Sequence, residues 1–135
     1  MKNLFSILIT ASLFGSYAIA GSIEYTYING ERCIKSIDGK IVTYSYMDGK
    51  YMPTALGADK IEYTYSSDGG YYPISLGDKK ISYKYVNGER YADSIGDEKI
   101  QYTTINGKDY PSAIGKRKIN YSYINSDYVP ISISN

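Results

Sequence analysis

The sequence predicts an all-β domain of six tandem strand-turn-strand repeats, each about 19 residues long. The first observation is a phrase of the form aliphatic-x-Tyr-x-Tyr, which recurs at steps of 19, 19, 20, 19 and 19 residues; only the fifth copy has Thr in place of the second Tyr. The second is an Asn-Gly or Asp-Gly dipeptide after this phrase in five of the six copies, which is typical of a tight β-turn. The third is an alternation of apolar and polar residues, without any helical period in residues 21–135. The repeats start at Ile23, Val42, Ile61, Ile81, Ile100 and Ile119.

The first strand of each repeat carries aromatic residues at two positions of one face. We expect these rings to form columns between neighbouring repeats, because a constant period aligns equivalent residues. Offset or edge-to-face ring pairs contribute about 0.5–1.5 kcal/mol each beyond their buried area. The predicted structural ladder consists of Tyr25, Tyr44, Tyr63, Tyr83, Tyr102 and Tyr121, followed two residues later by Tyr27, Tyr46, Tyr65, Tyr85 and Tyr123.

The turn that follows the first strand decides which residues share a face. A two-residue loop at Asn87-Gly88 would place Tyr91 opposite Lys84, away from the other tyrosines. A three-residue loop that begins at Val86 would instead place Tyr91 opposite Tyr83. We expect the three-residue loop because it collects Ile81, Tyr83, Tyr85, Tyr91 and Ile95 on one face, and Ser82, Lys84, Arg90 and Ser94 on the other.

The second strand of each repeat has proline at a fixed position in four copies. Proline lacks a backbone donor and therefore suits a strand that is unpaired on one side. This favours hairpins whose second strand is partly an edge. Two arrangements stay open: the repeats stack in parallel as a β-solenoid, or they form a repetitive β-hairpin sheet. The prolines are Pro53, Pro73, Pro111 and Pro130.

The amino terminus has the three parts of a secretory signal peptide. Lys2 provides a basic start, "LFSILITASLFG" an apolar core, and Ala18-Ile19-Ala20 a small-residue cleavage site. We therefore expect residues 1–20 to be removed and residues 21–135 to be a single secreted, extracellular or cell-surface β-repeat domain.

Composition restricts the function. Without Lys2, 14 basic and 14 acidic residues remain, and nucleic acid or an anionic membrane would require a basic excess. The sequence contains no histidine, which is the usual general base and metal ligand, and shows no nucleophile-base constellation. We expect no enzymatic activity, no cofactor, no metal site and no membrane span in the mature chain.

Cys33 is the single cysteine of the chain, so an intrachain disulfide cannot form. It stands at a position where other repeats have Met, Tyr or Val, which favours a small buried apolar side chain. An intermolecular disulfide is the alternative, because an unpaired cysteine is unusual in an exported protein.

Phrases such as "INGKDY" and "VNGERYADSIG", with the period and the aromatic content, resemble the hairpin repeats of choline-binding and clostridial-toxin cell-surface binding modules. That resemblance implies a spiral of hairpins with aromatic pockets for a sugar or choline, although those families use tryptophan and this chain has none. The unit length and the expected secretion also resemble the curlin amyloid repeats, whose Gln and Asn ladders are absent here. Neither resemblance identifies site residues.

Two functions follow from the repeats. The repeats reach nearly to both ends of residues 21–135, so we expect uncapped ends that template self-association into a fibre, matrix or adhesive surface layer. The alternative is a monomeric module that binds a cell-surface glycan or the cell wall through aromatic residues. The predicted assembly residues are Ile23, Tyr25, Tyr27, Tyr128, Ile131 and Ile133, and the predicted surface-binding residues are Tyr51, Tyr71 and Tyr128, on the face opposite the tyrosine columns.

Overall fold

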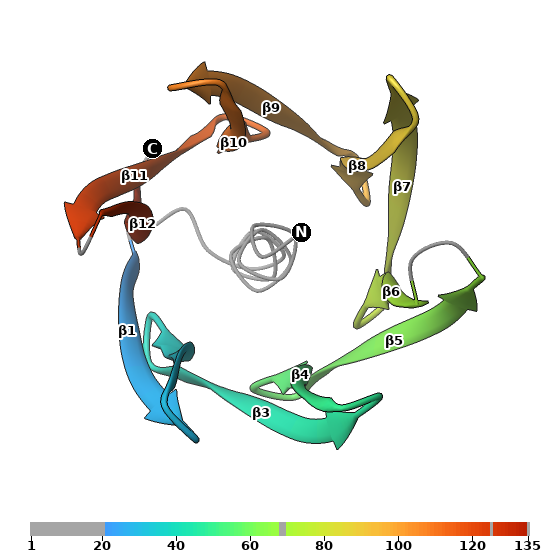
Figure 1. Cartoon of the computed structure of the whole chain (residues 1–135), viewed down its shortest axis with the longest axis vertical. Helices are drawn as coiled ribbons and strands as arrows, with labels where there is room; N and C mark the ends of the chain where they lie inside the picture. Colours follow the sequence, from blue (N-terminus) through green and yellow to red (C-terminus); the bar gives the residue numbers. More distant parts are fainter. Residues whose placement is uncertain (1–20, 68–69, 125, 135) are drawn as a thin grey trace.

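Residues 21–67, 70–124 and 126–134 are described by the computed structural model, and they form twelve antiparallel β-strands in a closed barrel (Figure 1). The expected signal peptide, residues 1–20, lies outside the described residues. The strands are β1 (Gly21–Ile28), β2 (Glu31–Ile37), β3 (Lys40–Met47), β4 (Lys50–Leu56), β5 (Asp59–Ser66), β6 (Gly70–Leu76), β7 (Lys79–Val86), β8 (Glu89–Ile95), β9 (Glu98–Ile105), β10 (Lys108–Ile114), β11 (Arg117–Ile124) and β12 (Asp127–Ser134).

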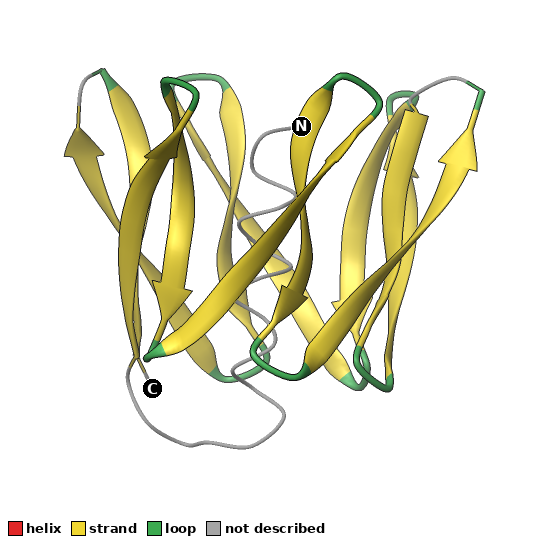
Figure 2. Ribbon diagram, turned by 90° about the horizontal axis from the view of Figure 1, so that it is seen from below, coloured by secondary structure: helices red, strands yellow, loops and turns green. Residues whose placement is uncertain are grey.

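Each predicted repeat is one β-hairpin, numbered here from hairpin 1 (β1 and β2) to hairpin 6 (β11 and β12). Within a hairpin the two strands pair along most of their length, whereas adjacent hairpins share only two residue pairs, such as Ser94 with Lys99 and Ile95 with Glu98. These two pairs lie beside the short connectors at one end of the barrel, and the Asn-Gly turns lie at the other end (Figure 2). Toward the turns, neighbouring hairpins therefore contact one another through side chains.

The turn in hairpin 4 has two residues, so the expected three-residue loop is wrong. Val86 pairs with Glu89, and Asn87 and Gly88 both have positive φ values, 51° and 80°. Two consecutive positive φ values are typical of a type I′ turn, which matches the right-handed twist of the flanking strands. Tyr91 consequently lies opposite Lys84, and Arg90 lies opposite Tyr85.

A β-bulge in the second strand of each hairpin explains why Ile95 lies on the predicted face although the predicted loop is wrong. In hairpin 4, Tyr83 pairs with Ala92 and Ser82 pairs with Ser94, which leaves Asp93 as the extra residue. The bulge reverses the alternation, so that Ile95 returns to the face of Ile81. Corresponding register shifts occur in all six hairpins.

The barrel closes between the first and the last strand. Gly21 pairs with Ile133 and Ser22 pairs with Ser132, which repeats the two-pair contact between the other neighbouring hairpins. The repeats thus adopt the antiparallel hairpin arrangement and form a ring, and they do not stack in parallel as a β-solenoid or continue as an open spiral. The uncapped strand ends expected from the sequence are therefore paired with each other.

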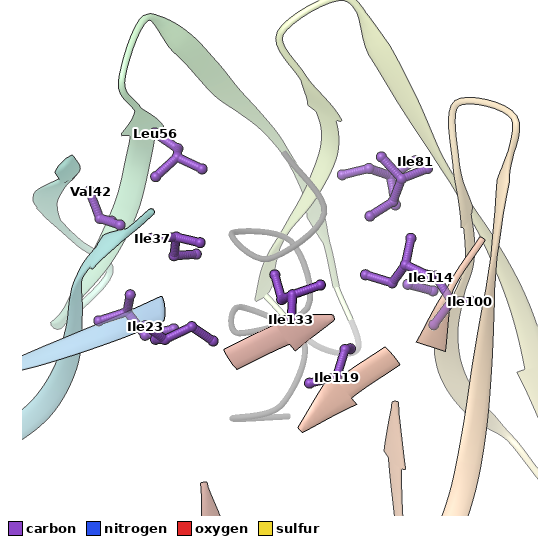
Figure 3. Packing of buried hydrophobic residues seen from close by; sticks show 12 residues of the cluster. Ile23, Ile37, Val42, Leu56, Ile81, Ile100, Ile114, Ile119 and Ile133 are labelled. Carbon is purple, nitrogen blue, oxygen red and sulfur yellow. The ribbon is translucent and has the colours of Figure 1, made fainter. Parts of the chain in front are cut away.

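The apolar core lies where the hairpins meet beside the connectors. Each hairpin contributes one cross-strand pair of buried aliphatic residues, and the labelled residues in Figure 3 point from the hairpins toward the interior of the ring. Full burial of such a side chain contributes about 1.5–3 kcal/mol. The pairs are Ile23 with Ile37, Val42 with Leu56, Ile61 with Leu76, Ile81 with Ile95, Ile100 with Ile114, and Ile119 with Ile133.

Ring closure predicts that the chain tolerates circular permutation. Fusing Asn135 directly to Gly21 leaves two residues between the paired Ile133 and Gly21, the same number as between Ile95 and Glu98. A permuted chain opened between Gly96 and Asp97, in an exposed connector, should fold with a melting temperature within a few degrees of the parent, measured by circular dichroism. Opening between Tyr83 and Lys84, inside β7, is the matched control and should abolish folding. Failure of the first permutant alone would contradict the closed ring.

Candidate binding surface

Six tyrosines, called here the inner tyrosines, connect adjacent hairpins by the same hydrogen bond. Each hydroxyl donates to a backbone carbonyl in the second strand of the preceding hairpin: Tyr44 to Ile34 at 2.7 Å, Tyr63 to Pro53 at 2.5 Å, Tyr83 to Pro73, Tyr102 to Ala92 at 2.7 Å, and Tyr121 to Pro111 at 2.7 Å. The sixth bond runs from Tyr25 to Pro130 at 2.5 Å and crosses the seam between the two ends of the chain.

The prolines explain the position of these bonds. Pro73 pairs with Tyr63, and its carbonyl accepts from the Tyr83 hydroxyl, so this carbonyl faces away from β5 toward hairpin 4. Among the described residues, no strand pairs at this height with the side of β6 that faces β7, because the pairing of these two strands is confined to Ser75 and Leu76. The hydroxyl of Tyr83 provides the donor that this carbonyl needs, and proline removes an N–H that would otherwise face the same gap. The second strand is thus a partial edge.

Ring contacts reinforce the hydrogen bonds between hairpins. Tyr83 packs edge-to-face on Tyr72 with ring centroids 5.3 Å apart, and Tyr102 packs in the same way on Tyr91 at 5.5 Å. Burial raises the pKa of every inner tyrosine well above the ordinary value of 10.0. With the hydroxyls bonded to carbonyls and the rings packed, these side chains are placed to hold the ring together.

The exposed aromatic surface lies two residues further along each first strand, toward the turns. There each hairpin presents one cross-strand pair, and we call these six pairs the rim pairs. Their first-strand tyrosines are 61–65% exposed, in contrast to the partly buried inner tyrosines. The rim pairs are Tyr27 with Arg32, Tyr46 with Tyr51, Tyr65 with Tyr71, Tyr85 with Arg90, Thr104 with Asp109, and Tyr123 with Tyr128.

The three predicted surface-binding tyrosines belong to the rim pairs, on the face that carries the tyrosine columns. The expectation that they occupy the opposite face is wrong. For Tyr51 and Tyr128 it assumed a three-residue loop where the structure has two residues, and for Tyr71 it left out the extra residue of hairpin 3, in which Ser66 pairs with Gly70. Tyr51 and Tyr71 are 38% and 39% exposed, and Tyr128 is half-buried. Each packs edge-to-face on its partner, with centroid distances of 5.1 Å to Tyr46, 5.2 Å to Tyr65 and 5.0 Å to Tyr123, respectively.

Charged and polar groups accompany these rings in the other hairpins. The guanidinium carbon of Arg90 lies 3.9 Å from the ring centroid of Tyr72 and 5.6 Å from that of Tyr85, and Arg90 Nε donates to the Tyr85 hydroxyl at 3.2 Å. In hairpin 5, Thr104 donates to Asp109 at 2.6 Å. The rim thus combines aromatic faces with fixed hydrogen-bonding groups.

A tyrosine on the opposite face, Tyr91, connects hairpins 4 and 5 through two carboxylates. Its hydroxyl lies 2.8 Å from Glu89 Oε2 and 3.3 Å from Asp109 Oδ2, as donor to these acceptors. The hydrogen bond to Glu89, followed by burial, raises the pKa of Tyr91 to about 12. Asp109 also accepts from Thr104, its partner in the rim pair of hairpin 5. The Tyr91 hydroxyl therefore connects this rim pair to hairpin 4.

The predicted assembly residues do not form a free end. Ile23 and Ile133 are buried in the core, and Tyr25 is bonded across the seam. Tyr27 belongs to a rim pair, and Ile131, 40% exposed, is the bulge residue of β12. Tyr128, described above, also belongs to a rim pair. The structure therefore distributes these six residues among the core, the seam, the rim and a bulge.

Cys33 is half-buried and lies opposite Thr26. It is therefore less buried than expected for a core side chain, and its thiol keeps some access to solvent. Its thiol lies 3.6 Å from the Glu31 carbonyl oxygen. Burial and then the charge of Glu31 raise the pKa of the thiol, which lowers the thiolate fraction near neutral pH. The alternative role, an intermolecular disulfide, stays a prediction.

Within residues 21–67, 70–124 and 126–134, no group of three or more His, Cys, Asp or Glu side chains gathers in a way that could hold a metal ion. In the same residues, no helix is long and apolar enough to span a membrane. No protein-family model, curated protein or solved structure is significantly similar to this chain.

Sequence reasoning missed Arg32, Arg90 and Asp109 as partners of the rim. The signal was present in the Asn-Gly turns, which favour a two-residue loop and so pair the fourth position of the repeat with the second residue after glycine. Counting outward from a two-residue turn would have identified five of the six rim pairs; hairpin 3 differs because Ser66 pairs with Gly70, which leaves three residues between them.

Proposed function

We propose that residues 21–135 form a secreted, non-enzymatic module that binds carbohydrate on a cell surface or cell wall through the rim pairs. The observation that carries this proposal is the repetition of exposed tyrosine beside a ring or a charged partner around one end of a closed ring. Tyrosine offers an apolar face and a polar hydroxyl, a combination that suits the faces and hydroxyl groups of a sugar ring.

The ring arrangement supports binding to a repeated ligand. Five of the six rim pairs contain an exposed tyrosine, and their hairpins are held at fixed positions by the seam and the inner tyrosines. Several weak sites on one rigid body gain apparent affinity when the ligand is itself multivalent, because the second contact is intramolecular. A polysaccharide surface provides such a ligand.

Self-association is the second candidate, although its basis changes. Strand addition at open ends loses its template because β1 pairs with β12. Two observations still favour contact between copies: the zero formal net charge of residues 21–135, and the exposed rings of the rim. A fibre, matrix or adhesive layer would then form through the rim and not through the strand ends.

The carbohydrate proposal predicts that rim substitutions remove binding without unfolding the ring. Tyr46→Ala, Tyr65→Ala and Tyr123→Ala together should weaken binding of a free oligosaccharide, chosen by screening residues 21–135 on a glycan array, by about tenfold or more. The estimate assumes about 0.5–1.5 kcal/mol for each aromatic contact, and 1.4 kcal/mol is tenfold. Isothermal titration calorimetry measures the change.

The matched control replaces exposed side chains of the opposite face in the first strands, with Glu24→Ala, Thr43→Ala and Gln101→Ala. This variant should bind as the parent does. Absence of any glycan ligand, or equal binding by both triple variants, would reject the carbohydrate proposal. Molar mass in solution separates the second candidate: oligomers of the parent that dissociate in the tyrosine triple variant would establish self-association through the rim.

A further inference from the structure

Three of the six rim pairs place two phenols in direct contact across a hairpin, and five of these six phenols are exposed, while Tyr128 is half-buried. The ring centroids of Tyr46 and Tyr51, Tyr65 and Tyr71, and Tyr123 and Tyr128 are 5.0–5.2 Å apart, with the ring planes inclined by 65–73°. Their backbone positions are paired directly, so the two side chains of each pair stay adjacent for as long as the hairpin is formed.

Exposure distinguishes five of these six phenols from the inner tyrosines, and the half-buried Tyr128 is paired with the exposed Tyr123. A phenol that gives up an electron must also give up its proton to form a neutral radical, and an exposed hydroxyl can release that proton to water. The inner tyrosines donate to backbone carbonyls, and burial raises their pKa values, so that both the oxidant and a proton acceptor have poorer access to them.

We infer that these three Tyr–Tyr rim pairs are sites of oxidative coupling to dityrosine, which joins the two strands of a hairpin by a carbon–carbon bond. The co-reactant is a one-electron oxidant of the peroxidase class with hydrogen peroxide. Each phenol loses one electron and one proton, and one peroxide is reduced to two waters by the two electrons and two protons. The two phenoxyl radicals then combine through ring carbons ortho to oxygen, and the hydrogens on those carbons move to the oxygens to restore both aromatic rings.

The geometry favours coupling within one chain over coupling between chains. The partner radical is already in van der Waals contact, whereas a second chain must arrive by diffusion. Exposed side chains change rotamer within nanoseconds, so the edge-to-face rings can bring their ortho carbons together without a change in the backbone. The product would fix hairpins 2, 3 and 6 against opening.

The remaining hairpins are controls within the same molecule. Hairpins 1 and 4 pair tyrosine with Arg32 and Arg90, and hairpin 5 pairs Thr104 with Asp109. An arginine, threonine or aspartate side chain cannot form a phenoxyl radical. Intrachain cross-strand dityrosine should therefore be confined to hairpins 2, 3 and 6. The inference does not rest on carbohydrate binding.

The test treats dilute residues 21–135 with horseradish peroxidase and hydrogen peroxide. Dityrosine fluorescence should appear with a yield that is unchanged on tenfold dilution, in a product that migrates as a monomer in denaturing electrophoresis. Peptide mapping by mass spectrometry should find Tyr46 linked to Tyr51, Tyr65 to Tyr71, or Tyr123 to Tyr128. The oxidised monomer should also melt at a higher temperature than the untreated chain.

The matched variant carries Tyr51→Phe, Tyr71→Phe and Tyr128→Phe, which keep the ring contacts but remove one phenol from each pair. It should lose the intrachain product, with circular dichroism confirming that the fold is intact. Dityrosine found only in covalent dimers, an equal monomeric yield from the variant, or cross-links located mainly at the inner tyrosines would each overturn the inference.

Discussion

Above pH 10 the ring is expected to unfold cooperatively, because unfolding releases the six inner tyrosines together. Burial raises the pKa of each of them above the ordinary value of 10.0, and this value applies once the chain is unfolded. Between the two values the unfolded chain has lost protons that the folded chain still holds, so the free energy of unfolding falls as pH rises. The contribution is complete below pH 10 and is lost as pH approaches the folded-state pKa values.

The size of this effect follows from linkage. One tyrosine protonated only in the folded state reduces the free energy of unfolding by at most about 1.4 kcal/mol per pH unit. Six such groups, even if solvent screening leaves a fraction of this slope, act on a total of about 5–15 kcal/mol for a typical domain. Tyrosinate absorbance and far-ultraviolet circular dichroism, recorded in one titration, should change at the same pH. Complete ionisation with native circular dichroism would contradict the prediction.

Tyr83→Ala is expected to lower the free energy of unfolding by about 3–5 kcal/mol, the range for truncation of a large packed aromatic side chain. The substitution removes the ring contact with Tyr72 and the hydrogen bond to the Pro73 carbonyl, both of which hold hairpin 4 against hairpin 3. Tyr83→Phe keeps the ring and should cost about 1–3 kcal/mol, because the carbonyl loses its donor in a partly buried site. Urea denaturation measures both differences.

The control lies two residues away on the same strand. Tyr85 is 63% exposed and belongs to a rim pair, so Tyr85→Ala should change stability by about 0.5 kcal/mol or less. Similar losses for Tyr83→Ala and Tyr85→Ala would show that the two tyrosine positions are energetically equivalent. That result would remove the distinction between inner tyrosines and rim pairs.

The local structure was largely predictable from the sequence. The repeated phrases predicted six strand-turn-strand units, with a β-solenoid and a hairpin sheet both open. Alternation correctly placed Ile81, Tyr83 and Tyr85 on one face, whereas Ile95 was assigned to that face through the incorrect three-residue loop. The predicted loop length was wrong because we assumed that β8 pairs with β7 in one uninterrupted register along its whole length. The bulge at Asp93 lets a two-residue turn coexist with an inward-facing Ile95, and no glycine or other distinctive residue marks that bulge in the sequence.

Closure of the ring and the candidate surface were harder to predict. The strand that begins near Ile23 resembles the strand that begins near Ile81, so nothing local indicates that β1 receives β12 as its neighbour. The inner tyrosines were predicted to lie in columns, but their bonds to carbonyls depend on the angle between hairpins, which periodicity does not specify. The rim pairs depend on the length of the loop, and because that length was predicted wrongly, the rim pairs were not predicted.

Because Gly21 pairs with Ile133, the ring is closed, and adding or removing one hairpin would affect the whole ring. Tandem repeats commonly gain or lose units when replication slips, and an open array accommodates such changes at its ends. Here a ring of five or seven units would have a different angle at every junction and a different distance from each inner tyrosine to its carbonyl. Selection should therefore preserve copy number at six while allowing the exposed positions of individual units to diverge, as the fifth unit already does with Thr104 and Asp109.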